Sequence, residues 1–115
     1  MALIPLVLLG GAAGAIVRFL IGRALNGTHP WGTFAVNVTG AGLLGLLAGL
    51  GNRLPQELLV LLGTGLCGAL TTWSTLATEI VALPRWRGLA YAASTVACGL
   101  ATASLGWWLA GLTGR

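Results

Sequence analysis

The segment that decides the fold is Gly63–Thr75, which reads GTGLCGALTTWST. It mixes glycines with hydroxyl-bearing residues, yet apolar residues flank it on both sides and no charged residue occurs between Glu57 and Glu79. A regular lipid-facing helix has no need of so many glycines and hydroxyl groups, which instead favour an irregular backbone. At membrane depth, irregular backbone is tolerated only inside protein or beside a water-filled cavity. The segment therefore predicts a membrane helix that is broken near its middle. The alternative is an unbroken helix whose small residues and hydroxyls pack against neighbouring helices.

The composition of the whole chain indicates a membrane protein. Of its 115 residues, 57% are hydrophobic and only 7% are charged, whereas soluble domains carry about 25% charged residues. A spanning helix needs about 20 mostly apolar residues, so four such helices and short turns account for the chain. We expect an all-α fold. A single transmembrane domain should extend over residues 1–115, with spans at about 3–25, 31–50, 56–83 and 89–112. The predicted turns are 26–30, 51–55 and 84–88.

The net charge of +4 does not indicate nucleic-acid binding. The basic residues are arginines that stand singly or in loose pairs and form no basic stripe, so they are better interpreted as the flanking charges of membrane spans. They divide almost evenly between the two sides: Arg53 and Arg115 on one, and Arg23, Arg85 and Arg87, with Arg18 nearby, on the other. So weak a bias is compatible with insertion in either orientation.

Polar residues inside the predicted spans are the candidates for function. Arg18 and Glu79 are ionisable, and an intramembrane ionisable group is a functional candidate by default, although either could reach the interface from near a span end. Thr33 and Asn37 share one face of the second span. We expect the Asn37 amide to meet water or an ion rather than protein, because an unpaired amide in an apolar setting is costly.

No set of residues in the chain predicts catalysis or a metal site built from side chains. Cys67 and Cys98 fall inside apolar stretches and are expected to be buried free thiols. His29 lies in a predicted turn, and no nucleophile–base pair or metal-ligand spacing accompanies it. We therefore do not expect an enzyme.

Three ordered motifs lie on the predicted spans. Residues 10–18 read GGAAGAIVR, residues 32–40 read GTFAVNVTG and residues 65–76 read GLCGALTTWSTL. They resemble, in the same order, the GGxxGAxxR, GTxxVNxxG and GxxGGxTTFSTF motifs of the Fluc/CrcB family of fluoride channels, and Glu79 stands at that family's acidic position. The resemblance extends over essentially the full length of the chain.

The resemblance implies a channel that exports cytoplasmic fluoride passively across the bacterial plasma (inner) membrane and so reduces fluoride toxicity. It also implies an antiparallel dimer with a central sodium ion, held by backbone carbonyls of Gly68 and Thr71 from each subunit. Hard oxygen ligands suit such a cation. The partners implied are fluoride, sodium, membrane lipid and a second chain. The candidate pore-lining residues are Thr33, Asn37, Trp73, Ser74, Thr75, Leu76, Glu79, Tyr91 and Thr95, with Arg18 in a vestibule.

The sequence departs from the family where two pore phenylalanines are expected. Trp73 and Leu76 replace them here; a tryptophan can offer a positive ring edge and an N–H to an anion, whereas leucine offers neither. The chain therefore forms either a variant homodimeric pore or one half of a heterodimer with a related chain, in which it could be the non-conducting partner. A proton-coupled exporter of the small multidrug-resistance type is the other alternative, but residues 12–15 read AAGA where that class requires a carboxylate.

Overall fold

The computed structural model describes residues 3–113, so Arg115 of the orientation argument lies outside the described part. Within this range the chain is all helical, and the only β-type pairing is an isolated bridge between Asn26 and Pro30. The helices are α1 (Leu3–Leu25), α2 (Trp31–Leu50), the 3-10 turn η1 (Gly51–Arg53), α3 (Gln56–Leu59), the π-helix η2 (Val60–Cys67), α4 (Gly68–Leu70), α5 (Trp73–Ala82) and α6 (Arg85–Thr113).

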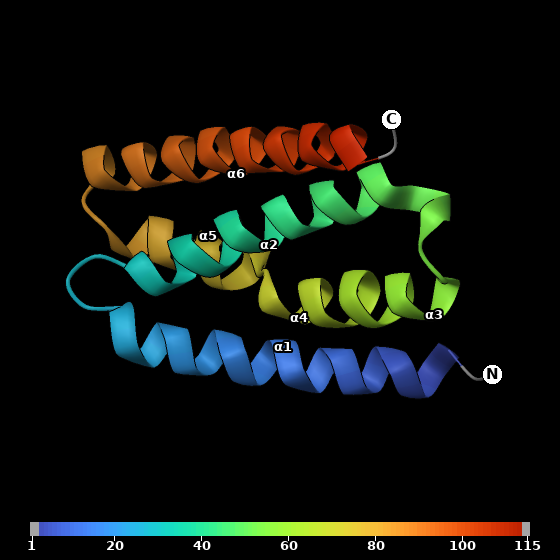
Figure 1. Ribbon diagram of the computed structural model, residues 1–115. Coiled ribbons are helices and arrows are strands. Elements are labelled where there is room, and N and C mark those ends of the chain that lie inside the picture. The colour runs from blue at the N-terminus through green and yellow to red at the C-terminus, as the bar shows by residue number, and fades with distance from the viewer. Residues whose placement is uncertain (1–2, 114–115) are drawn as a thin grey trace.

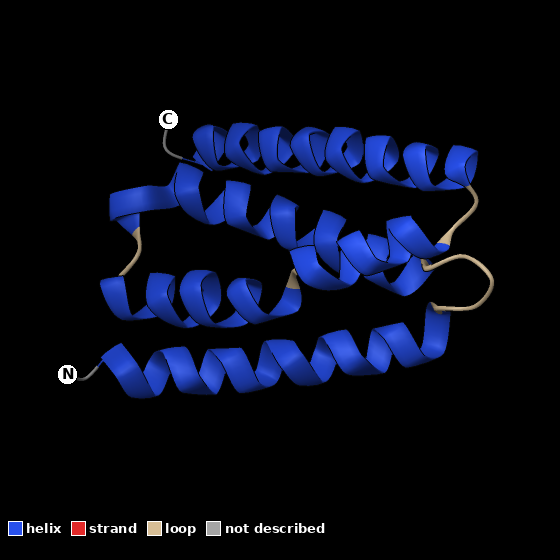
Figure 2. Cartoon of the chain, turned by 180° about the vertical axis from the view of Figure 1, so that it is seen from behind, coloured by secondary structure: helices blue, strands red, loops and turns tan. Residues whose placement is uncertain are grey.

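Four helical stretches are long and apolar enough to cross a membrane, namely Leu3–Leu25, Trp31–Leu50, Gln56–Ala82 and Arg85–Thr113. The chain is therefore a multi-pass membrane protein. The first two stretches have the bounds that the sequence predicts. All four run roughly side by side, with α1 and α6 on the outside and α2 and the third stretch between them (Figure 1). The molecule measures 44 × 32 × 20 Å, and the view from behind shows short loops at both ends (Figure 2).

Glycines bring the helix backbones together. α2 packs mainly along α6, and α1 packs mainly along η2. A Cβ atom added at Gly45 of α2 would overlap the backbone carbonyl of Ala103 in α6, and one at Gly14 of α1 would overlap the carbonyl of Leu66. Close approach of this kind is how helices associate where lipid competes for apolar surface.

The third stretch is the irregular one. A continuous helical run of α3, η2 and α4 ends at Leu70, and Thr71 (φ −81°, ψ 153°) and Thr72 (φ −150°, ψ 126°) are extended before α5 begins. The Thr72 hydroxyl accepts a hydrogen bond from the Thr75 backbone N–H at 3.2 Å, which caps the first turn of α5. The Thr71–Thr72 segment therefore divides the third stretch into two helices.

Two sequence-based expectations are wrong. Residues 84–88 do not form a turn, because α6 already begins at Arg85 and the Gly88 N–H donates to the Pro84 carbonyl at 2.8 Å. Proline favours the start of a helix, where its missing N–H costs nothing. Cys67 is buried as expected, but Cys98 is exposed. An apolar stretch in a membrane protein can face lipid, so apolar sequence does not by itself imply burial in protein.

Candidate ion pathway

Asn37 bridges α2 to the extended Thr71–Thr72 segment. Its Oδ1 accepts a hydrogen bond from the Thr72 backbone N–H at 2.8 Å, and its Nδ2 donates to the Thr72 backbone carbonyl at 3.3 Å. The side-chain amide thus supplies hydrogen-bond partners for the Thr72 N–H and carbonyl, which a continuous helix would otherwise pair with other backbone groups. The expectation that the Asn37 amide is unpaired with protein is therefore wrong. One N–H of its Nδ2 group is still available, since an amide nitrogen carries two hydrogens.

Glu79 ties three helices together. Its Oε2 accepts a hydrogen bond from the Thr33 hydroxyl of α2 at 3.0 Å, and its Oε1 accepts one from the Tyr91 hydroxyl of α6 at 2.9 Å. Thr33 and Tyr91 are 4% and 2% exposed. The Thr95 hydroxyl, also buried, donates to the Tyr91 carbonyl at 2.8 Å. Charge-assisted bonds of this kind hold the carboxylate and both hydroxyls in fixed positions.

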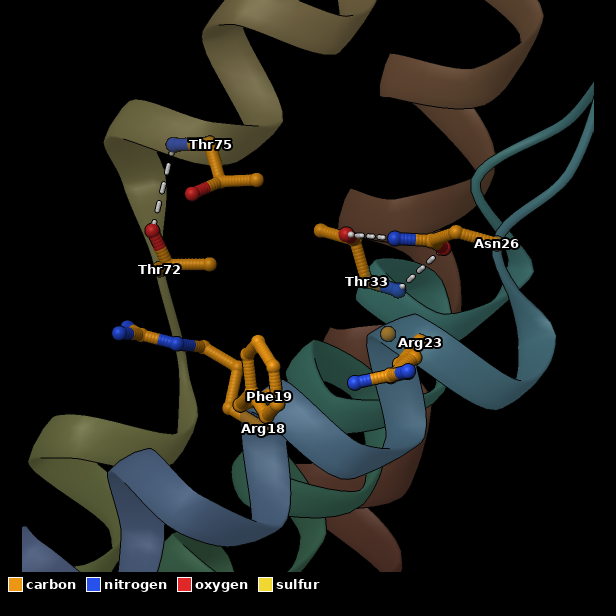
Figure 3. Close-up of a pocket in the computed structure, with 8 residues that line it drawn as sticks. Arg18, Phe19, Arg23, Asn26, Thr33, Thr72 and Thr75 are labelled. Atoms are coloured by element: carbon orange, nitrogen blue, oxygen red, sulfur yellow. Dashed lines mark hydrogen bonds between the residues drawn. The ribbon is translucent and has the colours of Figure 1, made fainter.

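A pocket of about 450 Å³ opens beside this cluster, and we call it the Arg18 pocket. In Figure 3, Thr72 and Thr75 stand on one side, Asn26 and Thr33 stand opposite, and side chains of α1 form the floor. Its lining residues are Arg18, Phe19, Gly22, Arg23, Asn26, Thr33, Thr72 and Thr75. Two guanidinium groups beside neutral hydroxyls raise the local concentration of small anions.

A second pocket, of about 320 Å³, shares Thr72 with the first, and we call it the Trp73 pocket. Trp73 is 79% exposed at its edge, whereas Leu76 is only 4% exposed. The pocket is lined by Asn37, Ala41, Leu44, Thr71, Thr72, Trp73, Leu76, Thr95, Val96, Gly99, Leu100 and Ala103. It is mostly apolar, with a few hydroxyl, amide and indole groups that can donate hydrogen bonds. Thr72 lines both pockets, which are therefore adjacent.

The backbone of Gly68 and Thr71 fits the sodium site that the family resemblance implies. A continuous helix would pair these two carbonyls with the N–H groups of Thr72 and Thr75, but those groups donate to the Asn37 and Thr72 side chains instead. No hydrogen bond within the described residues ends on either carbonyl. A Cβ atom added at Gly68 would meet only one atom, at 3.9 Å. Carbonyl oxygens that accept no hydrogen bond are suitable ligands for a hard cation.

Most of the residues predicted from the sequence lie at these two pockets. Arg18, Thr33 and Thr75 line the Arg18 pocket, whereas Asn37, Thr71, Trp73, Leu76 and Thr95 line the Trp73 pocket. Glu79 and Tyr91 stand behind Thr33 in the buried cluster. Ser74 is exposed and, like Gly68, lines neither pocket.

The sequence did not single out several residues that the structure places at the site. Asn26 was assigned only to a turn, yet its Oδ1 accepts hydrogen bonds from the backbone N–H groups of Gly32 at 2.8 Å and Thr33 at 3.2 Å. It satisfies otherwise unpaired groups in the first turn of α2. Phe19 and Arg23 look like ordinary lipid-facing and interfacial residues in the sequence. An asparagine a few residues before a helix start was the one signal that could have been read.

Comparisons with known proteins cover most of the chain and agree with one another. A family model described as "CrcB-like protein, Camphor Resistance (CrcB)" matches residues 5–107. A protein of Rhodococcus jostii named "Fluoride-specific ion channel FluC 2" is 48% identical over 110 residues, which covers 90% of this chain and 95% of that protein. "Fluoride-specific ion channel FluC 1" of Streptomyces avermitilis is 44% identical over 115 residues, covering 91% and 93%. "Fluoride-specific ion channel FluC 2" of Moorella thermoacetica is 46% identical over 111 residues, covering 89% and 91%.

Proposed function

The chain belongs to the CrcB family, and we propose that it is a fluoride-selective channel through which cytoplasmic fluoride leaves passively, so that fluoride toxicity falls. The observation that carries this proposal is near full-length similarity to relatives named fluoride-specific ion channels. A channel of this kind is not an enzyme. The same relatives favour neither a multidrug exporter nor a non-conducting subunit.

The ion path that we propose runs from the Arg18 pocket past Thr72 into the Trp73 pocket. Guanidinium groups at the entrance attract the anion without closing around it, because the Arg18 pocket is wide and solvent can screen the charges. Neutral donors replace water along this path: the Thr75 hydroxyl in the Arg18 pocket, and, beyond Thr72, the remaining N–H of Asn37 and the indole N–H of Trp73. Conduction needs sites that bind strongly enough to admit an ion and weakly enough to release it, and neutral hydrogen-bond donors meet both conditions.

We assign Glu79 to the wall of this path rather than to direct contact with fluoride. A free carboxylate would repel an anion, but both of its oxygens accept hydroxyl hydrogens from Thr33 and Tyr91. These bonds spread the negative charge over buried partners. They also fix the orientation of the Thr33 hydroxyl, which belongs to the lining of the Arg18 pocket, and of the Tyr91 hydroxyl.

A second copy in antiparallel orientation would complete the channel. The proposal places the Thr71–Thr72 segment near the middle of the membrane, with the Gly68 and Thr71 carbonyls of both copies around one sodium ion. The free carbonyls, the exposed side of Gly68 and the nearly even distribution of arginines support it. When bound, sodium would supply a fixed positive charge near both anion paths, where a low dielectric makes such a charge effective.

Fluoride efflux from liposomes tests the proposed function. The purified chain is reconstituted alone into liposomes loaded with potassium fluoride, and external fluoride is followed with an ion-selective electrode after a potassium ionophore is added. Matched liposomes loaded with potassium chloride give the control. We expect fast fluoride efflux and no chloride efflux above protein-free liposomes. Equal efflux of both ions, or none with or without a related chain from the same organism, would refute the proposal.

The same liposomes test the sodium site. Replacing sodium with a bulky organic cation during purification and assay should stop flux or weaken the dimer, because only a small cation can be surrounded by backbone carbonyls. Sodium-independent flux from a stable dimer would refute the sodium site while leaving the fluoride channel intact.

A further inference from the structure

A groove between α2 and α6 shares no lining residue with either pocket of the ion pathway. Its volume is about 360 Å³, and it is lined by His29, Trp31, Phe34, Arg87, Ala90, Tyr91, Ser94 and Cys98. The proposed ion path does not pass through it, although Tyr91 also belongs to the Glu79 cluster that forms the wall of that path. We call it the Arg87 groove.

The groove is polar at one end and mostly apolar along its length. Its α6 residues Arg87, Tyr91, Ser94 and Cys98 recur at intervals of four, three and four, so they lie on one face of the helix. From Arg87 to Cys98 the helix rises by about 16 Å, which is about half the thickness of the bilayer's hydrocarbon core. The groove is therefore long enough to accommodate a large part of one acyl chain along α6.

The cation at the polar end is held in place by the protein. The Arg87 Nη2 donates to the Thr28 carbonyl at 3.2 Å and lies 3.5 Å from the His29 Nδ1. The His29 ring packs edge-on against Tyr91, with the ring centroids 5.2 Å apart. It also lies against the Trp31 ring in a tilted arrangement, with the centroids 4.5 Å apart. No carboxylate within the described residues pairs with Arg87, so the remaining N–H donors of its guanidinium are free to bind an anion.

We propose that the Arg87 groove binds an anionic glycerophospholipid, with the phosphate at Arg87 and an acyl chain along Phe34 and Cys98. Guanidinium groups bind phosphate through two parallel hydrogen bonds, and basic pockets between membrane helices accept lipid headgroups. Trp31, 57% exposed at the headgroup end, is the type of residue found at the membrane interface. The apolar length of the groove favours a lipid over a free phosphate ion, because only a lipid has an acyl chain that can contact the apolar residues.

Native mass spectrometry of the purified protein tests the proposal. Retention of phosphatidylglycerol is compared with retention of phosphatidylcholine at equal concentrations, and inorganic phosphate is added as competitor. We expect preferential retention of phosphatidylglycerol and about fivefold weaker retention in Arg87→Gln protein, the effect of about one basic residue near an anionic headgroup. Arg85→Gln is the matched control, because Arg85 begins the same helix but lines a different pocket; its retention should not change. Ser94→Trp fills the groove without changing charge and should also displace the lipid.

Four results would overturn the assignment. Equal losses in Arg87→Gln and Arg85→Gln proteins would mean general surface electrostatics. Equal retention of the two lipids would mean that the headgroup charge plays no part. Full competition by inorganic phosphate would mean a site for a free anion. A changed monomer–dimer ratio in Ser94→Trp protein without a change in lipid retention would mean that a second copy of the chain occupies the groove.

Discussion

Replacing Asn37 with alanine should both destabilise the Thr71–Thr72 segment and reduce fluoride flux. The substitution removes the hydrogen bonds of 2.8 Å and 3.3 Å that the amide makes with the Thr72 peptide. A polar group left unpaired away from water costs about 1–3 kcal/mol. Because Thr72 is partly exposed, water can satisfy one of the two groups, and we expect a total loss near 1–3 kcal/mol in the free energy of unfolding.

Thermal unfolding in detergent and fluoride efflux from liposomes, measured on the same preparations, check this prediction. Asn37→Asp is the matched control: it keeps an acceptor for the Thr72 N–H but loses the donor to the Thr72 carbonyl and adds a negative charge. It should recover part of the lost stability and none of the flux. Normal flux in a destabilised Asn37→Ala protein would show that the amide only supports the backbone. Unchanged stability would refute the proposed role of the two hydrogen bonds.

Substitutions at four further residues test other parts of the structure. Trp73→Ala should abolish fluoride efflux and Leu76→Phe should preserve or increase the efflux, because the Trp73 side chain is exposed in the Trp73 pocket and Leu76 only forms part of its wall. Full efflux in Trp73→Ala protein alone would refute the pore assignment. A wild-type chain that conducts only together with a related chain would indicate a heterodimer. Glu79→Gln should lower the unfolding temperature, because one of the two hydroxyl groups loses its acceptor, at a cost of about 1–3 kcal/mol in the free energy of unfolding. Glu57→Gln is the control and should leave the unfolding temperature unchanged, because Glu57 is exposed. Gly45→Ala should cost about 1–3 kcal/mol through overpacking against α6, whereas Ala at Gly111, which has open space, should be neutral by the same thermal assay.

The membrane architecture could be predicted from the sequence alone. Long apolar stretches specify spanning helices because a helix satisfies its own backbone groups wherever it lies in lipid. The ranges 3–25 and 31–50 could therefore be assigned without knowledge of their neighbours. The motif around Thr71 and Thr72 likewise predicted both an irregular third span and the family. Thr33 and Asn37 were named as candidates from their place on one face of the second span, and Trp73 from the resemblance to the family.

Only the tertiary structure decided what each polar group does. Asn37 meets Thr72 across 35 positions and Thr33 meets Glu79 across 46. Arg53 reaches Ala110 across 57, where its guanidinium donates to the carbonyl at 2.7 Å. The partners in each pair come from different parts of the chain, and helical periodicity fixes only the face on which a residue lies, not the residue opposite. Within a membrane each polar group must find a partner inside the protein, so the packing of the helices determines whether an amide faces an ion or holds a neighbouring backbone.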